Sequence, residues 1–110
     1  MKLPNGDLAV VDIEKVRDYC LNPDHSHGRN KARVFRSALG LTQKDGHVLR
    51  ESLLEAAREG DAVGGHVNEF GAHFSVDFEM TWGSRRAVIR SGWIIVLGGC
   101  IPRLTTCYVR

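Results

Sequence analysis

The chain has few of the features that would tie it to a membrane, a metal or an oxidising compartment. Its 110 residues contain three widely spaced cysteines and no C-x-x-C pair, so we expect neither a disulfide framework nor a zinc ribbon. No apolar run approaches the ~20 residues that a membrane-spanning helix needs. The stretch 1–6 carries one lysine and no hydrophobic segment, so we expect no signal peptide, no membrane partner and a cytoplasmic location.

Several motifs of nucleotide-binding and catalytic proteins are also missing. The chain has no G-x-x-x-x-G-K-[ST] and no G-x-G-x-x-G, the two glycine-rich patterns that hold phosphates. It has no G-x-S-x-G nucleophile motif either. The pair His25-x-His27 has the spacing of metal ligands but lacks a second cluster, so we expect no metal site and no cofactor.

The composition is that of an ordinary globular domain. Hydrophobic residues make up 43% of the chain and charged residues 25%, which argues against disorder. A chain of 110 residues can form one hydrophobic core and no second domain. We therefore expect residues 1–110 to form a single domain.

Helical signals fill the N-terminal half of the chain. Asp12 is a candidate N-cap, and apolar residues then follow at helical spacing as far as a turn with a proline at position 23. Two further stripes of apolar residues recur every three or four positions. These patterns predict helices near 12–21, 29–39 and 43–59.

In the C-terminal half the hydrophobic period changes from 3.6 to two. Apolar residues alternate with polar ones from Phe74 to Met80, and two glycine-containing turns follow. We expect antiparallel strands near 72–81, 86–97 and 103–109, with weaker signals for short strands at 8–11 and 66–70. The predicted fold class is α+β, with two to three N-terminal helices packed on a three- to five-stranded antiparallel β-meander.

Charges are segregated along the chain. Residues 29–36 hold four basic side chains and residues 80–110 hold five, with no acid in either stretch. Residues 44–79 contain eight carboxylates. Such blocks predict a basic and an acidic surface, and a basic surface attracts polyanions. The alternative is that the uneven charge distribution is accidental, as it often is in small domains, and binds no ligand.

The segment from His25 to Lys31 groups basic side chains at the start of a predicted helix. Free amides and the helix dipole favour an anion there, and Arg29 would bind a phosphate with two hydrogen bonds. Lys31 lies four residues before Phe35 and so points along the buried edge of the helix. The alternative for Lys31 is a long side chain that reaches past the core into solvent.

A second polar set is predicted on the strands. Arg90 shares a face with Gly92, and a glycine beside an arginine leaves room for a ligand to approach the sheet. Thr106 and Tyr108 share a face of the last strand because strands have a period of two. The alternative is that both residues are there because half-exposed strands favour Thr and Tyr.

The residues also carry a family resemblance over nearly the whole chain. Its motifs are L-N-P-x-H at 21–25, G-R-x-K-A-x-V-F at 28–35, A-L-G at 38–40, V-D-F-x-M at 76–80, V-x-R-S-x-W-I at 88–94 and P-R-L-x-T-x-Y at 102–108. In these motifs the chain resembles a family of small uncharacterised bacterial domains, found alone or at the C-termini of polymorphic toxins. The layout of helices followed by a meander is similar to the barnase/EndoU/colicin/RelE-like ribonuclease superfamily.

The resemblance implies a metal-independent endoribonuclease toxin that cleaves RNA by attack of the 2′-hydroxyl on the adjacent phosphate. It implies catalytic roles for His25, Lys31, Arg90 and Thr106, and RNA binding by Arg29 and Tyr108. The histidine would act as acid or base, and the cations would hold the phosphate. His27 and Gly92 depart from the family pattern. A toxic nuclease also implies a neutralising protein partner, an antitoxin or immunity protein, whose acidic surface would match these basic segments.

Two other functions stay open at this point. The first is a non-catalytic binding module, either an antitoxin or immunity protein or an adaptor, that uses the open face of the sheet. The second is a nucleotide-using transferase toxin, for which Glu79 would be the candidate carboxylate. Convergence of His25, Lys31, Arg90 and Thr106 in one cleft would favour the nuclease, because its chemistry needs these groups around one phosphate. Scatter of these four residues would favour the binding module.

Overall fold

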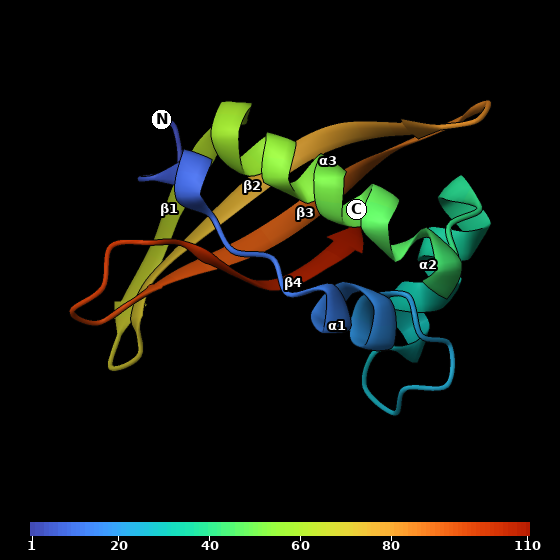
Figure 1. The fold of residues 1–110 in the computed structure, drawn as a ribbon, viewed down its shortest axis with the longest axis horizontal. Coiled ribbons are helices and arrows are strands. Elements are labelled where there is room, and N and C mark those ends of the chain that lie inside the picture. The colour runs from blue at the N-terminus through green and yellow to red at the C-terminus, as the bar shows by residue number, and fades with distance from the viewer.

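The computed structural model describes residues 1–110 and divides them into a helical half and a sheet (Figure 1). The elements are η1 (Gly6–Leu8), α1 (Ile13–Lys15), η2 (Val16–Cys20), α2 (Arg29–Leu39), η3 (Gln43–Asp45), α3 (Gly46–Glu59), β1 (Ala62–Asn68), β2 (Gly71–Trp82), β3 (Arg85–Val96) and β4 (Arg103–Val109). The strands pair antiparallel in the order β1-β2-β3-β4. Three helical units therefore precede an open four-stranded sheet, and the predicted α+β meander is confirmed. None of these helices is both long and apolar enough to cross a membrane.

The predicted helix boundaries agree closely with the structure. α2 spans the predicted 29–39 and ends at Gly40, whose φ of 77° is the left-handed conformation that glycine adopts without strain. The third helix begins with a capping box, in which the Thr42 amide donates to the Asp45 carboxylate over 2.9 Å. The first predicted helix is shorter and wider, since α1 has a single turn and continues as the π-helical η2. Asp12 stands at its N-cap but makes no capping bond and instead pairs with Arg103.

The two long strands have one buried and one open face, as the alternating pattern predicted. In β2, Val76 and Met80 are buried against the helices, while Asp77 faces the other side. The register pairs Asp77 with Arg90 of β3, and Arg90 in turn with Tyr108 of β4. These three side chains therefore lie on the outer face of the sheet, opposite the face that carries Val76 and Met80.

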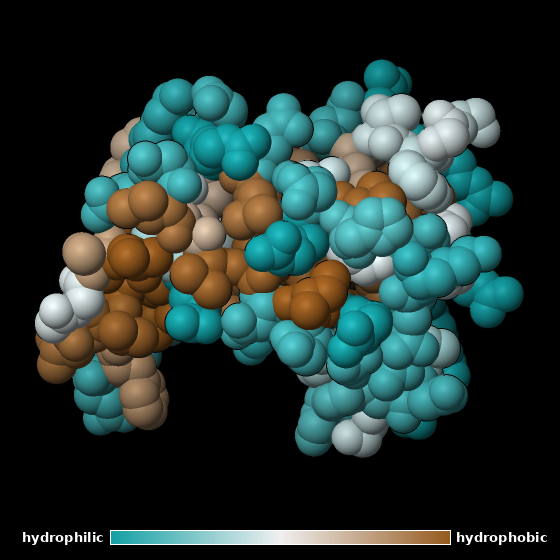
Figure 2. All heavy atoms as spheres, in the orientation of Figure 1, coloured by the Kyte–Doolittle hydropathy of each residue, from teal (hydrophilic) through white to brown (hydrophobic).

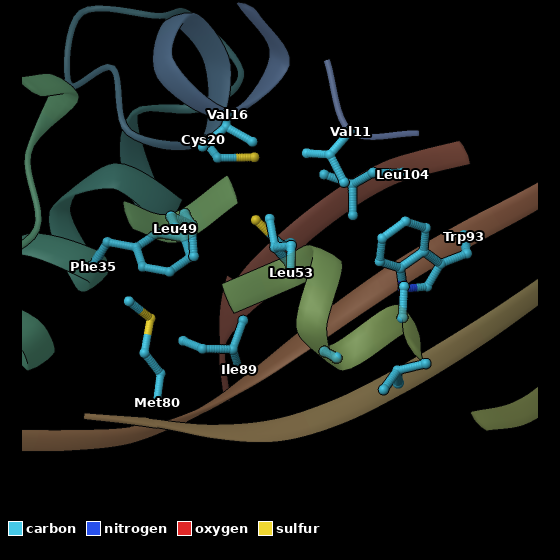
Figure 3. Packing of buried hydrophobic residues seen from close by; sticks show 14 of the residues in the cluster. Val11, Val16, Cys20, Phe35, Leu49, Leu53, Met80, Ile89, Trp93 and Leu104 are labelled. Atoms are coloured by element: carbon cyan, nitrogen blue, oxygen red, sulfur yellow. The ribbon is translucent and has the colours of Figure 1, made fainter. Parts of the chain in front are cut away.

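One hydrophobic core fills the space between the helices and the inner face (Figure 3). Phe35 of α2, Leu53 of α3 and Trp93 of β3 point into it and are fully buried. The indole N–H of Trp93 donates to the Ser91 hydroxyl over 2.9 Å, and Ser91 donates to a backbone carbonyl of β2. Every polar group of this buried pair therefore has a partner.

The two edges of the sheet are covered differently. The N-terminal chain reaches β4 through a parallel bridge between Val10 and Arg103, so the weakly predicted strand at 8–11 is a single bridge. η2 and α2 lie beside the rest of β4 (Figure 1). β1 begins before the predicted 66–70 and is exposed after its first residue. Figure 2 shows apolar side chains gathered at the end where the β1–β2 and β3–β4 turns of Figure 1 lie. The exposed apolar residues in and beside these turns include Val67, Phe70 and Leu97.

Candidate functional site

Polar side chains from the helical half meet β4 along its covered edge. The Lys15 ammonium of α1 donates to the Thr105 carbonyl over 3.3 Å. Behind this contact the thiols of Cys20 and Cys107 are both fully buried and interact with each other, and this interaction, with burial, raises the pKa of Cys107. Lys15 and Cys20 therefore both hold the α1–η2 segment against β4, and Tyr19 lies between them in the sequence.

His25 caps the turn that leads into α2. Its Nδ1 accepts hydrogen bonds from the backbone N–H groups of His27 and Gly28, each over 3.0 Å, and its carbonyl accepts from Arg29. Two donors on Nδ1 require a lone pair there, which places the ring proton on Nε2. The predicted anion site on free amides is thus filled by the His25 ring, while Arg29 remains exposed at the first residue of α2.

Tyr19 of η2 connects the two basic residues that the sequence singled out. Its ring packs edge-on against the His25 ring, with centroids 4.9 Å apart. Its hydroxyl accepts a hydrogen bond from the Lys31 ammonium over 2.9 Å, and that ammonium lies 5.0 Å from the centre of the ring. Lys31 therefore does not extend freely into solvent but is held, half-buried, by Tyr19.

Two hollows lie on either side of this contact. The first, of about 660 Å³, is lined by Lys15, Tyr19, His25 and Thr105 together with three carboxylates, Asp12, Glu14 and Asp18. The second, of about 320 Å³, is lined by Asn30, Lys31, Val34, Tyr108 and Val109. Because Tyr19 lines the first hollow and Lys31 the second, their hydrogen bond joins the two.

Arg90 is held by a carboxylate on the outer face of the sheet. Its Nε and Nη2 donate to the two oxygens of Asp77 over 2.8 and 2.9 Å, and Arg110 donates to the same carboxylate over 2.9 Å. The hydrogen bond from Arg90 lowers the pKa of Asp77 and keeps it ionised. Asp77 in turn raises the pKa of Arg90, as does the interaction with Tyr108. Arg90 is therefore already paired with a carboxylate, and the two hydrogen bonds hold Asp77 in place.

A β-bulge distinguishes the two threonines of β4. The register shifts at Gly92, which opposes Thr106, so Thr105 is the additional residue. A Cβ at Gly92 would lie 2.9 Å from the Thr105 hydroxyl, so the space above Gly92 holds Thr105 rather than a ligand. Thr105 lines the first hollow, whereas the Thr106 hydroxyl is buried without a hydrogen-bond partner.

The predicted residues do not share one cleft. His25 lines the first hollow, Lys31 and Tyr108 line the second, and Arg90 and Thr106 line neither. Sequence reasoning missed four residues of this region, Glu14, Lys15, Tyr19 and Thr105. The i, i+4 spacing of Lys15 and Tyr19 placed both on one helical face, but nothing marked the bulge that exposes Thr105. No three side chains of His, Cys, Asp or Glu lie together in a way that would hold a metal ion.

A family profile matches residues 2–110, almost the entire chain. The chain belongs to the family described as a domain of unknown function, DUF6883. No curated protein matches it. Among solved structures, this member of the family is similar to a chain of a contact-dependent growth inhibition toxin–immunity protein complex from Klebsiella pneumoniae 342. The TM-score is 0.70 at 21% sequence identity, over 92% of this chain and 99% of that chain.

The structural match extends to both halves of the domain. A coverage of 92% cannot be reached by the four strands alone, so the helical half also has counterparts in the Klebsiella chain. At 21% identity the likeness establishes the fold. The chemistry of this chain must be argued from its own side chains.

Proposed function

We propose that this domain is a toxin-type endoribonuclease that cleaves RNA by attack of a 2′-hydroxyl on the adjacent phosphate. The observation that carries the proposal is the contact series from His25 through Tyr19 to Lys31, which joins two hollows beside β4. The Klebsiella structure, a complex of a growth inhibition toxin with its immunity protein, supports a role in toxicity or in its neutralisation.

The reaction requires a proton acceptor, a proton donor and positive charge near the phosphate. Glu14 is the one carboxylate of the first hollow that forms no ion pair, since Asp12 pairs with Arg103 and Asp18 with Arg17. Glu14 accepts the proton of the 2′-hydroxyl as the new O2′–P bond forms. The phosphate then carries additional negative charge, which the Lys31 ammonium stabilises.

Tyr19 is suited to protonate the leaving group. Its oxygen already accepts a hydrogen bond from Lys31, so the phenolic proton is directed elsewhere and a developing phenolate is stabilised. The phenol gives its proton to the 5′-oxygen as the P–O5′ bond breaks. His25, with its proton on Nε2, donates to a non-bridging oxygen rather than acting as the base. The products are a 2′,3′-cyclic phosphate and a free 5′-hydroxyl.

A protein partner completes the proposal. Arg29 is exposed, Lys31 is half-buried, and the chain has a net charge of +2. An immunity protein or antitoxin that presents carboxylates to these cations would exclude RNA by occupying the same surface. This partner is acidic in the region that faces α2.

Purified protein should cleave RNA in the presence of a chelator and leave 2′,3′-cyclic phosphate ends. Lys31→Met, Tyr19→Phe and Glu14→Gln should each reduce the rate by about 10²–10⁴-fold, because each removes a charge or a transferable proton. His25→Asn should also slow the reaction while it keeps an oxygen that accepts the two amide hydrogen bonds. His27→Ala, an exposed histidine in the same loop, is the matched control and should leave the rate unchanged.

Expression in bacteria provides an independent readout. Growth arrest by the wild-type domain, relieved by Lys31→Met but not by His27→Ala, would agree with the cleavage assay. Folded wild-type protein that leaves RNA intact, with chelator and with divalent ions in turn, would contradict the nuclease. A non-catalytic antitoxin, immunity or adaptor module that uses the open sheet face would then be the better account.

A further inference from the structure

Helix α2 carries an apolar residue, Val34, outside the stripe that packs into the core. Its buried residues Ala32, Phe35 and Leu39 face the sheet, yet Val34 lies off this stripe and is 45% exposed. Asn30 precedes Val34 by one helical turn and lies on the same face. Both line the 320 Å³ hollow, whose opposite side is Tyr108 and Val109 of β4.

We infer that this second hollow binds one unpaired base of the RNA, stacked on Tyr108 and read along its edge by Asn30. The inference rests on the proposed nuclease function and names the part of the substrate that this site takes. Single-stranded RNA is recognised in this way elsewhere, by aromatic rings that stack on bases and polar groups that bond their edges.

The composition of the hollow suits a base better than a charged ligand. An aromatic ring and two valines give flat apolar contact, and the Asn30 amide offers a donor and an acceptor side by side. No carboxylate lines this hollow, whereas three line the first. Lys31, which also lines this hollow, is joined to Tyr19, so a base in the second hollow would have its own phosphate near the proposed catalytic groups.

The Tyr108 ring is also held in place from the sheet. Arg90 lies opposite Tyr108 in the strand register, interaction with Tyr108 raises the Arg90 pKa, and Asp77 binds Arg90 through both oxygens. A ring fixed in advance loses little conformational freedom when a base stacks on it. Arg90 is thus a positioning residue for the base site, which gives the fixed Asp77–Arg90 pair a function.

The test measures binding of short 2′-O-methylated oligouridylates with one central adenosine or guanosine, which cannot undergo 2′-hydroxyl attack. Tyr108→Ala should weaken binding by about 5- to 150-fold, because stacking on an aromatic ring contributes about 1–3 kcal/mol per base. Tyr108→Phe retains the ring and should bind within about threefold of wild type. Thermal unfolding of each variant checks that the fold is intact.

The edge of the base is tested by exchanging the amide for a carboxylate. An Asp side chain only accepts hydrogen bonds, which suits the two N–H donors of guanine and not the donor–acceptor pair of adenine. Asn30→Asp should therefore shift the adenosine-to-guanosine preference about tenfold toward guanosine. Asn22→Asp adds the same charge outside the hollow and should weaken both oligonucleotides equally.

The outcomes separate the base site from the nuclease. If Tyr108→Ala binds like wild type, or if Asn30→Asp leaves the preference unchanged while the wild type still cleaves RNA, the base site is wrong and the nuclease stands. If the wild type neither binds these oligonucleotides nor cleaves RNA, both proposals are overturned.

Discussion

The two edges of the sheet offer a direct comparison within one small domain. Along β4 the backbone is covered by the N-terminal chain, η2 and α2, and side chains from these elements meet those of the strand. Along β1 the covering consists of Met1 and Lys2 at the beginning, and every residue from Val63 to Asn68 is exposed. Both edges end the same sheet, but only one brings together side chains from distant parts of the sequence.

The difference shows what positions chemistry in this fold. At β4 the side chain of Lys31 is fixed by Tyr19, which comes from another element, so the distance between the two is set by packing. At β1 the nearest comparable contact is His66 stacked on His73, with ring centroids 4.3 Å apart, and both belong to one hairpin. We expect substitutions at the covered edge to be much more costly than matched substitutions at the open one.

The largest contrast is expected from two glycine substitutions. A Cβ at Gly28 would collide with the backbone carbonyl of Tyr19, whereas a Cβ at Gly64 would have no atom within 4 Å. Gly28→Ala should lower the free energy of unfolding by about 1–3 kcal/mol, because η2 and α2 must move apart. Gly64→Ala should be neutral or stabilise slightly, by up to about 1 kcal/mol, because alanine restricts the unfolded chain. Chemical denaturation measures both.

The same pair tests the link between the edge and the proposed chemistry. Displacement of Tyr19 by the Gly28→Ala substitution should break its hydrogen bond to Lys31, so RNA cleavage should fall even under conditions where the variant is folded. Equal stability of the two variants would show that the two edges are not constrained differently.

A smaller contrast is expected from two histidines. His25→Ala removes an acceptor from two backbone amides and should cost about 1–2 kcal/mol. His66→Ala removes an exposed ring at the open edge and should change stability by less than about 0.5 kcal/mol. His25→Asn should restore most of the loss, since its side-chain oxygen can replace Nδ1. Loss of protection of the Gly28 amide in hydrogen exchange of His25→Ala would locate the effect.

Most of the fold and part of the candidate site could be predicted from the sequence. The helix at 29–39 was predictable because its apolar stripe and the glycine that ends it lie close together in the sequence. The pairing of β2 with β3 was predictable because alternation and a short turn determine it locally. β1 was predicted only in part, because the glycines at 64 and 65 interrupt its alternation.

The site was less predictable because its contacts join separate elements. The direction of Lys31 followed from helical periodicity, but its partner Tyr19 depends on how η2 packs against α2. Thr106 was singled out because alternation places it beside Tyr108 and because it matches the family motif, whereas the bulge opposite Gly92 makes Thr105 the threonine of the first hollow. Arg90 was expected to bind phosphate, but the register places Asp77 directly opposite it.

The smallest contrast concerns two ion-paired carboxylates and depends on pH. Asp77 on the outer face binds two arginines, and the hydrogen bond from Arg90 lowers its pKa in the folded state. A lowered folded-state pKa means that the carboxylate stabilises the fold fully above its unfolded pKa of about 4, and that this contribution is lost as the pH falls through the folded value. Asp77→Asn should therefore lower the melting temperature by a few degrees at pH 7 and by progressively less below pH 4.

Asp61→Asn, at the open edge, removes a pair in which the carboxylate is 85% exposed, and it should lower the neutral-pH melting temperature by less. Melting curves of the two variants and the wild type between pH 2 and pH 7 measure this, and a pH-independent deficit for Asp77→Asn would mean that the residue stabilises the fold through packing rather than charge.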